Sequence, residues 1–280
     1  LLSTAFLSHG DTRHVLLIPS SVEECYELAM QAFDLAERFQ TPVFVMMDLD
    51  LGMNNWMSNG FEYPTKPLDR GKRLTPEILK QLGDWGRYKD VDGDGIPYRT
   101  VPGDGMPAFF TRGSGHNAKA QYSERPDDYV SNVDRLGRKF ETARVCVPAP
   151  VVETSRDATI GIIGCGTSHW AIAESRDQLR EETNVQTSYL RVRAYPFNDD
   201  VVRFIDAHER LYVVEQNRDA QLAMLLRLEL SPERSGKLRS VLHYNGLPID
   251  ARSVSDAILA QEGFEVVSRE TPASSSSMMG

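Results

Sequence analysis

Cysteine is scarce in this chain of 280 residues, and its spacing excludes one class of site. The three cysteines, Cys25, Cys146 and Cys165, form no C-x-x-C pair, so no zinc or iron–sulfur site built from cysteine pairs is expected. So few thiols favour a reducing compartment such as the cytoplasm. Each cysteine lies in or beside an apolar run, where a small buried side chain is its expected role.

Long apolar runs and excess positive charge are also absent. No run approaches the roughly 20 residues that cross a bilayer, so no membrane span is predicted. Lysine and arginine total 31 against 40 aspartates and glutamates, which gives a formal net charge of −9. Nucleic acids and anionic membranes attract basic surfaces, so this balance favours proteins or small molecules as partners.

The segment from residue 9 to residue 57 predicts a strand, a helix and a second strand. The apolar run VLLIP passes through Ser20 and Ser21, which suit a helix N-cap, into residues whose apolar side chains recur at intervals of three and four. Phe33 is expected on the apolar face of this helix and Glu24 on its polar face. The run PVFVMMD then predicts the second strand.

The next part of the chain loses this periodicity. Residues 60–120 are rich in proline, glycine and aspartate, and they predict a long irregular insertion with one short helix at 75–82. A long helix is expected at 126–144, with Tyr129 facing inward. The prolines of VCVPAPVVE then predict a linker and a domain boundary near Pro150, because proline interrupts a helix.

Residues 151–265 are expected to form a second domain. Strands are predicted at 159–163, 187–192, 211–215 and 240–244, and helices at 168–182, 198–208, 220–229 and 253–261. This alternation predicts a parallel sheet with helices on both faces, so the fold class is α/β with two domains. Residues 266–280 are rich in serine and predict a disordered tail.

The loop before the first strand contains a histidine and an aspartate that could act together in proton transfer. His9, Gly10 and Asp11 place an imidazole beside a carboxylate, an arrangement that orients a proton donor. The alternative is a structural loop in which Asp11 caps and His9 packs.

Three polar residues follow the second strand. Asp48, Asp50 and Asn54 leave the carboxyl end of PVFVMMD, the edge at which open α/β sheets usually bind ligands. They are candidate cofactor ligands, with closure of a turn as the alternative.

An acidic motif matches the opening of a calcium loop. Asp90, Asp92, Asp94 and Gly95 have the required spacing, but Val101 stands where the bidentate acid is needed. A tight turn is therefore the better interpretation, and no metal site is predicted.

A glycine motif suggests a nucleotide. Gly161, Gly164 and Gly166 follow a strand, yet their order differs from the dinucleotide fingerprint, and Arg191 and Arg193 stand where a ribose-binding acid is expected. An NAD-dependent dehydrogenase is therefore the least favoured of the three functions considered for this chain; the other two are described below.

A basic, polar loop lies within FFTRGSGHNAKA. Its residues Arg112, His116 and Asn117 are expected at an interface, with a plain surface loop as the alternative.

Several of these segments together resemble a known family. HGDTRHVLLIPSSVEECYELAMQAFDLAERFQTPVFVMMDLDLGMNNWM, FEYPTKPLDRGK, FFTRGSGHN and YVVEQNRDAQL resemble the alpha subunits of 2-oxoacid:ferredoxin oxidoreductases, most closely the 2-oxoglutarate type. The resemblance runs from Leu1 to about Gly263.

The resemblance implies an architecture. Residues 1–150 correspond to the later part of a thiamine-pyrimidine-binding domain, and residues 151–265 correspond to a domain like the C-terminal domain of transketolase. The family's YPITP-type loop, pyrimidine-binding acid and substrate arginine would precede Leu1. The chain is therefore expected to be a portion of a longer subunit and to be inactive without partner polypeptides.

The resemblance also implies a reaction, the oxidative decarboxylation of a 2-oxoacid, with 2-oxoglutarate expected, to acyl-CoA with reduction of ferredoxin. Thiamine diphosphate would be shared with a beta subunit that holds magnesium and an iron–sulfur cluster, and coenzyme A would be a co-substrate. His9 to Asp11 would border the cofactor cleft, and Asn217 and Arg218 would face a neighbouring subunit of a hetero-oligomer. A nonenzymatic assembly subunit is the second hypothesis.

Overall fold

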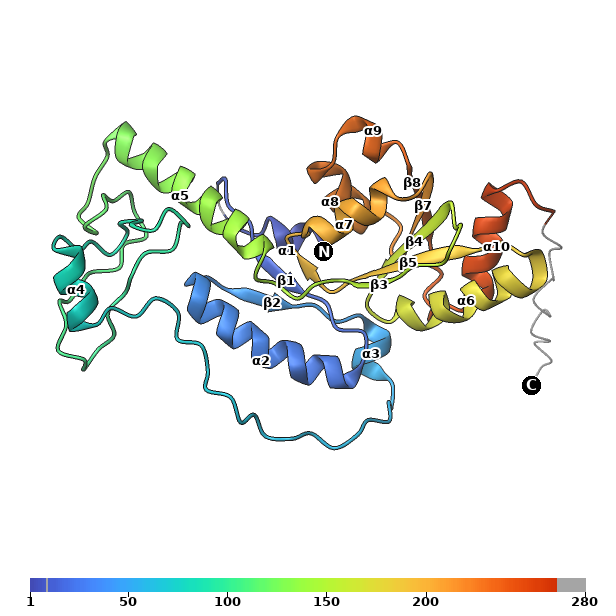
Figure 1. Cartoon of the computed structure of the whole chain (residues 1–280), viewed down its shortest axis with the longest axis horizontal. Coiled ribbons are helices and arrows are strands. Elements are labelled where there is room, and N and C mark those ends of the chain that lie inside the picture. The colour runs from blue at the N-terminus through green and yellow to red at the C-terminus, as the bar shows by residue number, and fades with distance from the viewer. Residues whose placement is uncertain (9, 266–280) are drawn as a thin grey trace, which may run out of the picture.

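A computed structural model describes residues 1–8 and 10–265 and shows an elongated molecule (Figure 1). His9 and the predicted tail at 266–280 lie outside the described residues. Two sheets occupy the middle and one end of the long axis, and a loop-rich arm projects at the other end. Within the described ranges, no helix combines the length and the hydropathy needed to cross a membrane.

The first sheet and its neighbouring helices comprise α1 (Leu2–Ala5), β1 (Val15–Leu17), α2 (Val22–Phe39), β2 (Val43–Val45), α3 (Leu49–Met53) and β6 (Ala194–Tyr195). The strand order is β2–β1–β6. Strands β1 and β2 are parallel and are connected by α2, which confirms the predicted strand–helix–strand unit. Strand β6 pairs antiparallel with β1, although it comes from beyond residue 150.

The second sheet and its helices comprise β3 (Val151–Glu153), β4 (Ile160–Cys165), α6 (Ser168–Thr183), β5 (Thr187–Val192), α7 (Asp199–Asp206), β7 (Arg210–Glu215), α8 (Gln221–Glu229), α9 (Pro232–Ser235), β8 (Leu238–Leu242) and α10 (Ala251–Gln261). The strand order is β3–β5–β4–β7–β8, with all but β3 parallel. Helices α6 and α10 cover one face, and α7 and α8 cover the other. The predicted α/β class with mostly parallel sheets is confirmed.

The prediction of a linker is wrong for residues 151–153. They form β3, which pairs with β5 at the edge of the second sheet. The prolines at 148 and 150 prevent a helix, but the adjacent valines Val151 and Val152 suit an edge strand. The domain boundary near Pro150 stays a prediction.

The arm consists of the predicted irregular insertion, with helix α4 (Pro76–Leu82), and of the first half of α5 (Pro126–Arg144). Its acidic motif forms a turn, as predicted: Asp90 accepts hydrogen bonds from the amides of residues 93 and 95, both at 3.0 Å. The Lys72 ammonium lies 2.6 Å from Asp92 and 2.7 Å from Asp94. A lysine thus neutralises the oxygens that a calcium ion would use.

Two aromatic residues that the sequence predicts to be buried lie on the surface. Phe33 of α2 is 72% exposed and Tyr129 of α5 is 65% exposed. Leu28, Leu35 and Phe39 supply the core contacts of α2 instead. The first half of α5 extends beyond both sheets, so neither sheet covers its apolar residues (Figure 1).

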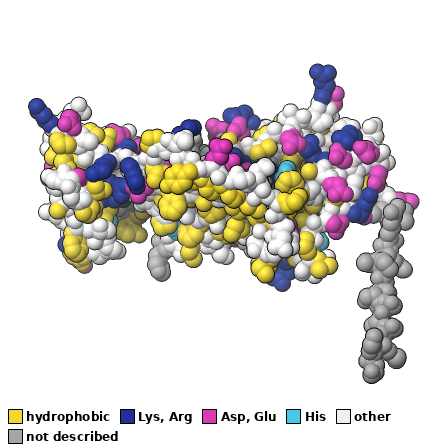
Figure 2. Space-filling view, turned by 90° about the horizontal axis from the view of Figure 1, so that it is seen from below, with side chains coloured by type: hydrophobic (Ala, Val, Ile, Leu, Met, Phe, Trp, Pro, Cys, Tyr) yellow, Lys and Arg dark blue, Asp and Glu magenta, His cyan; other side chains and the backbone are white. Residues whose placement is uncertain are grey.

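One face of the molecule, seen in Figure 2, carries hydrophobic side chains gathered across its middle. We call the exposed large apolar residues of α2 and of the segment after β2 the apolar belt: Phe33, Met47, Leu49, Met53, Met57, Phe61 and Tyr63. The segment packs on α2, because the rings of Tyr26 and Phe61 lie 4.9 Å apart and Cys25 contacts Met47 at 3.4 Å. Exposed apolar side chains that gather on one face are typical of interaction sites.

Candidate functional site

A cavity of about 830 Å³ lies where the arm meets the loop before β1. Its walls come from residues 10–12, residues 113–116 and 122–126, and one face of α5. Side chains such as Tyr129, Val130 and Leu136 make the α5 wall apolar. An apolar wall with a few convergent polar groups is the usual form of a ligand site.

This cavity brings together two groups of predicted site residues that are far apart in the sequence. Gly10 and Asp11 line it from one side and His116 from the other. Gly10 has a φ of +75°, and its carbonyl accepts the amide of Thr12 at 2.9 Å, so a tight turn presents Asp11 at the rim. His9 lies outside the described residues. A role for this loop in binding a cofactor stays a prediction.

The imidazole of His116 is held in a fixed orientation. Its Nδ1 lies 3.0 Å from the carbonyl of Ser114, and because a carbonyl only accepts, Nδ1 carries a proton. The Tyr88 ring lies 3.9 Å from it, and the Asn132 amide donates to the His116 carbonyl at 2.6 Å. Nε2 is buried and has no hydrogen-bond partner among the described residues.

Arg112 and Asn117 stabilise the loop that carries His116. Arg112 donates to the Ala120 carbonyl at 3.1 Å, and the Asn117 side chain accepts the amides of Lys119 and Gln121. These contacts give both residues an internal structural role. Their predicted place at an interface stays a prediction.

Asp48 joins the two sheets. Its Oδ1 accepts the amide of Leu51 at 3.0 Å, and its Oδ2 accepts the Thr167 amide at 2.7 Å and the Thr167 hydroxyl at 2.8 Å. A Cβ on Gly166 would lie 2.5 Å from Oδ2, which explains a glycine at that position. The turn that suggested a nucleotide site therefore holds the carboxylate of Asp48 at the start of α6.

Asp50 and Asn54 lie one helical turn apart on α3, where the Asn54 amide donates to the Asp50 carboxylate. Asn217 accepts the Gln221 amide at 3.1 Å beside α8, and Arg218 forms an exposed ion pair with Asp219 at 2.8 Å. The described residues contain no group of three or more His, Cys, Asp or Glu able to hold a metal ion. Cofactor and interface roles at these positions stay predictions.

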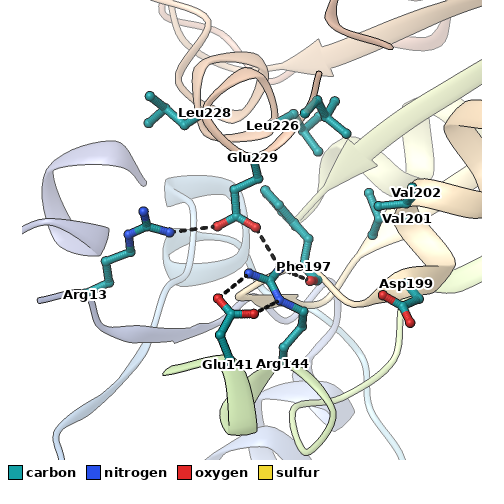
Figure 3. A pocket seen from close by; sticks show the side chains of 11 residues that line it. Arg13, Glu141, Arg144, Phe197, Asp199, Val201, Val202, Leu226, Leu228 and Glu229 are labelled. Carbon is teal, nitrogen blue, oxygen red and sulfur yellow. Dashed lines mark hydrogen bonds and ion pairs between the residues drawn. The ribbon is translucent and has the colours of Figure 1, made fainter. Parts of the chain in front are cut away.

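A second cavity, of about 440 Å³, contains a balanced network of charges (Figure 3). Glu229 pairs with Arg13 at 3.2 Å and with Arg144 at 2.7 Å, and Arg144 also pairs with Glu141 at 3.0 Å. The hydrogen bond from Arg144 holds the pKa of Glu141 below its ordinary value. Each charge has a partner within the chain, so this network connects α5, α8 and the loop before β1.

Glu24 is largely covered, with its side chain 13% exposed, although the sequence predicts it on a polar helix face. Arg191 donates to its carboxylate at 2.6 and 3.0 Å, and Arg193 at 2.8 Å. Burial opposes ionisation, but hydrogen bonds from Arg191 and Ser20 outweigh it and lower the pKa of Glu24 to about 2. Helical periodicity does not reveal this contact because both arginines are distant in the sequence, Arg191 in β5 and Arg193 between β5 and β6.

The three cysteines are free thiols. Burial raises the pKa of the Cys165 thiol to about 12, and burial also raises the pKa of Cys25. Both thiols therefore stay protonated and unreactive at neutral pH, as their apolar surroundings predict.

Comparison with known proteins places these features in a family context. Residues 3–58 match the family model described as pyruvate flavodoxin/ferredoxin oxidoreductase, thiamine diphosphate-binding. The 2-oxoacid:ferredoxin oxidoreductase 2 subunit alpha of Aeropyrum pernix is 29% identical over 92% of this chain and 40% of its own length. The 2-oxoglutarate synthase subunit KorA of Methanothermobacter thermautotrophicus is 28% identical over 82% of this chain and 62% of its own.

The fold has a solved counterpart. The 2-oxoglutarate:ferredoxin oxidoreductase from Magnetococcus marinus, with 2-oxoglutarate, coenzyme A and succinyl-CoA bound, matches 93% of this chain and 44% of its own with a TM-score of 0.79 at 20% identity. The chain thus spans 40 to 62% of the length of the two curated relatives named above. It is related in sequence over most of its length to the alpha subunits of 2-oxoacid:ferredoxin oxidoreductases.

Proposed function

We propose that this chain forms the alpha-subunit portion of a thiamine-dependent 2-oxoacid:ferredoxin oxidoreductase that oxidises 2-oxoglutarate to an acyl-CoA. The main support is similarity to named alpha subunits along 82 to 92% of the chain, in both sheets and in the arm. A single shared motif would not account for that extent. Cytoplasmic location belongs to this proposal and is supported by the three free thiols.

The chain's own residues would supply one wall of the site. The loop at Gly10 and Asp11 offers a carboxylate at the rim of the large cavity, and α5 offers an apolar wall against which a ring could pack. Thiamine diphosphate, when bound, supplies the stabilised carbanion that permits decarboxylation. Magnesium and the iron–sulfur cluster are assigned to the beta subunit, and ferredoxin and coenzyme A to the full assembly.

The proposal predicts that the purified chain alone does not reduce a viologen dye with thiamine diphosphate, 2-oxoglutarate and coenzyme A. Adding a beta subunit, together with any polypeptide that carries the rest of the alpha subunit, should produce dye reduction. Pyruvate in place of 2-oxoglutarate tests the choice of substrate. Robust reduction by the chain alone, or no activity in an assembled complex that contains thiamine and cluster, contradicts the proposal.

A nonenzymatic assembly role is the alternative outcome of the same experiment. It would appear as a stable complex whose activity is unchanged when this chain is omitted. NAD binding has lost its structural support, because Asp48 occupies the glycine turn at which a pyrophosphate would bind.

A further inference from the structure

Behind the wall of the large cavity lies a group of cations that form no ion pair with a carboxylate of the described residues. We call Arg87, Arg135 and Lys139 the basic cluster. Arg135 is 7% exposed, and the guanidinium groups of Arg87 and Arg135 lie 5.1 and 5.6 Å from the ring of Tyr88. Burial and the charges of Arg135 and Arg87 lower the pKa of Lys139 to about 8, so the three groups act on one another.

The cluster has few hydrogen-bond acceptors among the described residues. The Nε atoms of Arg87 and Arg135 are buried without a partner, and Lys139 has no hydrogen bond or ion pair with any described residue. The one hydrogen bond of the Arg135 side chain goes to the Gly95 carbonyl at 3.3 Å. Buried N–H groups without acceptors are costly, so a native protein normally supplies a partner.

The nearby carboxylate of Asp90 does not serve as a hydrogen-bond acceptor for the basic cluster. Asp90 accepts the amide of Gly95 at 3.0 Å and pairs with Arg138 at 3.1 Å. It forms no ion pair with any member of the basic cluster among the described residues. The charge of Asp90 acts on Arg135 without direct contact, so the local excess of positive charge is only partly compensated within the part of the chain that the structure describes.

The cluster is directly connected to the cavity. Tyr88, which contacts both guanidinium groups, also stacks on His116 of the cavity wall. Asn132 and Leu136 line the cavity on the same helix that carries Arg135 and Lys139. An anion at the cluster would thus lie immediately behind the cavity.

We propose that the basic cluster is a binding site for a small oxyanion, a phosphate or carboxylate group, held by the guanidinium groups of Arg87 and Arg135 and the ammonium of Lys139. Planar guanidinium groups bind the paired oxygens of either anion, and burial strengthens such contacts. The site goes beyond the proposed oxidoreductase function, because it requires neither thiamine nor a partner subunit.

The test is equilibrium thermal unfolding of the full chain with sodium phosphate or sodium succinate, against sodium chloride at equal ionic strength. Either oxyanion should raise the unfolding temperature saturably, and comparison of the two identifies the preferred class. Lys139→Met should raise the half-saturating concentration about tenfold, the effect of losing one charged contact. Because this substitution removes a partly buried charge that lies beside two other cations, the variant should fold at least as stably without added anion.

Lys80→Met, which removes an exposed lysine of α4, is the matched control and should respond to the oxyanions as the wild type does. Equal responses of wild type and Lys139→Met would overturn the site. An unfolding temperature that phosphate and succinate raise no more than chloride does would also overturn the site. That result would indicate that ordered water satisfies these atoms. Since no activity is measured, failure here is distinct from failure of the proposed function.

Discussion

At the scale of single residues, two carboxylates make contacts between distant parts of the chain: Asp48 binds Thr167, and Glu24 pairs with Arg191 and Arg193. The sequence proposes Asp48 as a cofactor ligand because it follows a strand, and that role stays a prediction; its contact with Thr167, which follows a strand of the other sheet, is not predicted. Glu24 is assigned to solvent because helical periodicity contains no information about Arg191 and Arg193. Long-range pairs of this kind depend on how sheets pack, which a single sequence does not specify.

Asp48→Ala should lower the free energy of unfolding by about 2 kcal/mol, because it leaves the Thr167 amide and hydroxyl without their charged acceptor. Asp50→Ala, in the short helix that Asp48 caps, is the matched control, because among the described residues the Asp50 carboxylate bonds only to the exposed Asn54 side chain. That variant should remain within about 0.5 kcal/mol of wild type. Urea unfolding of both variants measures their free energies of unfolding. Equal losses of stability would show that Asp48 does not join the sheets.

Glu24→Gln should cost about 3 kcal/mol at neutral pH, since it leaves the buried Arg191 and the partly buried Arg193 without their counter-charge. The folded-state pKa of about 2 lies below the ordinary value of 4.5. The stabilising contribution of Glu24 is therefore complete above pH 4.5 and is lost as the pH falls toward 2.

Unfolding curves of wild type and variant should accordingly converge on acidification. The control is Glu27→Gln on the exposed side of the same helix, which should match wild type throughout. A difference between wild type and Glu24→Gln that persists unchanged down to pH 2 would rule out this linkage.

At the scale of helices and strands, most ends could be predicted from the sequence. The strands that were missed are too short to show a pattern of their own. Helix α5 and strand β5 have the predicted ends, because proline, apolar periodicity and β-branched residues are local signals. Strands β3 and β6 are missed, since three and two residues are too short to show periodicity and are defined by pairing with distant strands. The large cavity is likewise unpredictable, because its walls come from separate elements.

The turn at 90–95 offers a test of how the arm is attached to α5. Gly93 and Gly95 both have positive φ, +77° and +78°, but only Gly95 approaches the helix. A Cβ there would lie 2.3 Å from the Lys139 amide nitrogen and 2.5 Å from the Arg135 carbonyl oxygen, whereas none of these close contacts exists at Gly93.

Gly93→Ala should therefore cost about 1 kcal/mol, the backbone strain alone. Gly95→Ala should cost about 3 kcal/mol or more, because backbone atoms of the helix must move. The difference in the free energy of unfolding between the two variants measures this close packing. Equal costs would mean that the turn does not press against α5.

At the scale of the whole molecule, the apolar belt predicts where a partner subunit binds. The belt follows β2 at the carboxyl edge of the first sheet, where the proposed shared site would lie. Leu49→Glu combined with Met57→Glu should weaken association with the beta subunit at least about tenfold, because burying two carboxylates is unfavourable. Leu247→Glu, at a residue 68% exposed near the second sheet, is the control.

Analytical ultracentrifugation of the purified components measures this association. Circular dichroism should show that the double variant keeps its fold, since Leu49 and Met57 are 80% and 96% exposed. Undiminished binding would place the partner on another surface, and the exposed wall of α5 would then be the next to examine.

Strand β6 has a consequence for how the protein melts. A single extended stretch supplies β5 to one sheet and, two residues later, β6 to the other. Thermal unfolding of either sheet must therefore break hydrogen bonds of the other sheet. Scanning calorimetry should record one endotherm whose van't Hoff and calorimetric enthalpies agree. Two resolved peaks would show that the halves come apart one at a time.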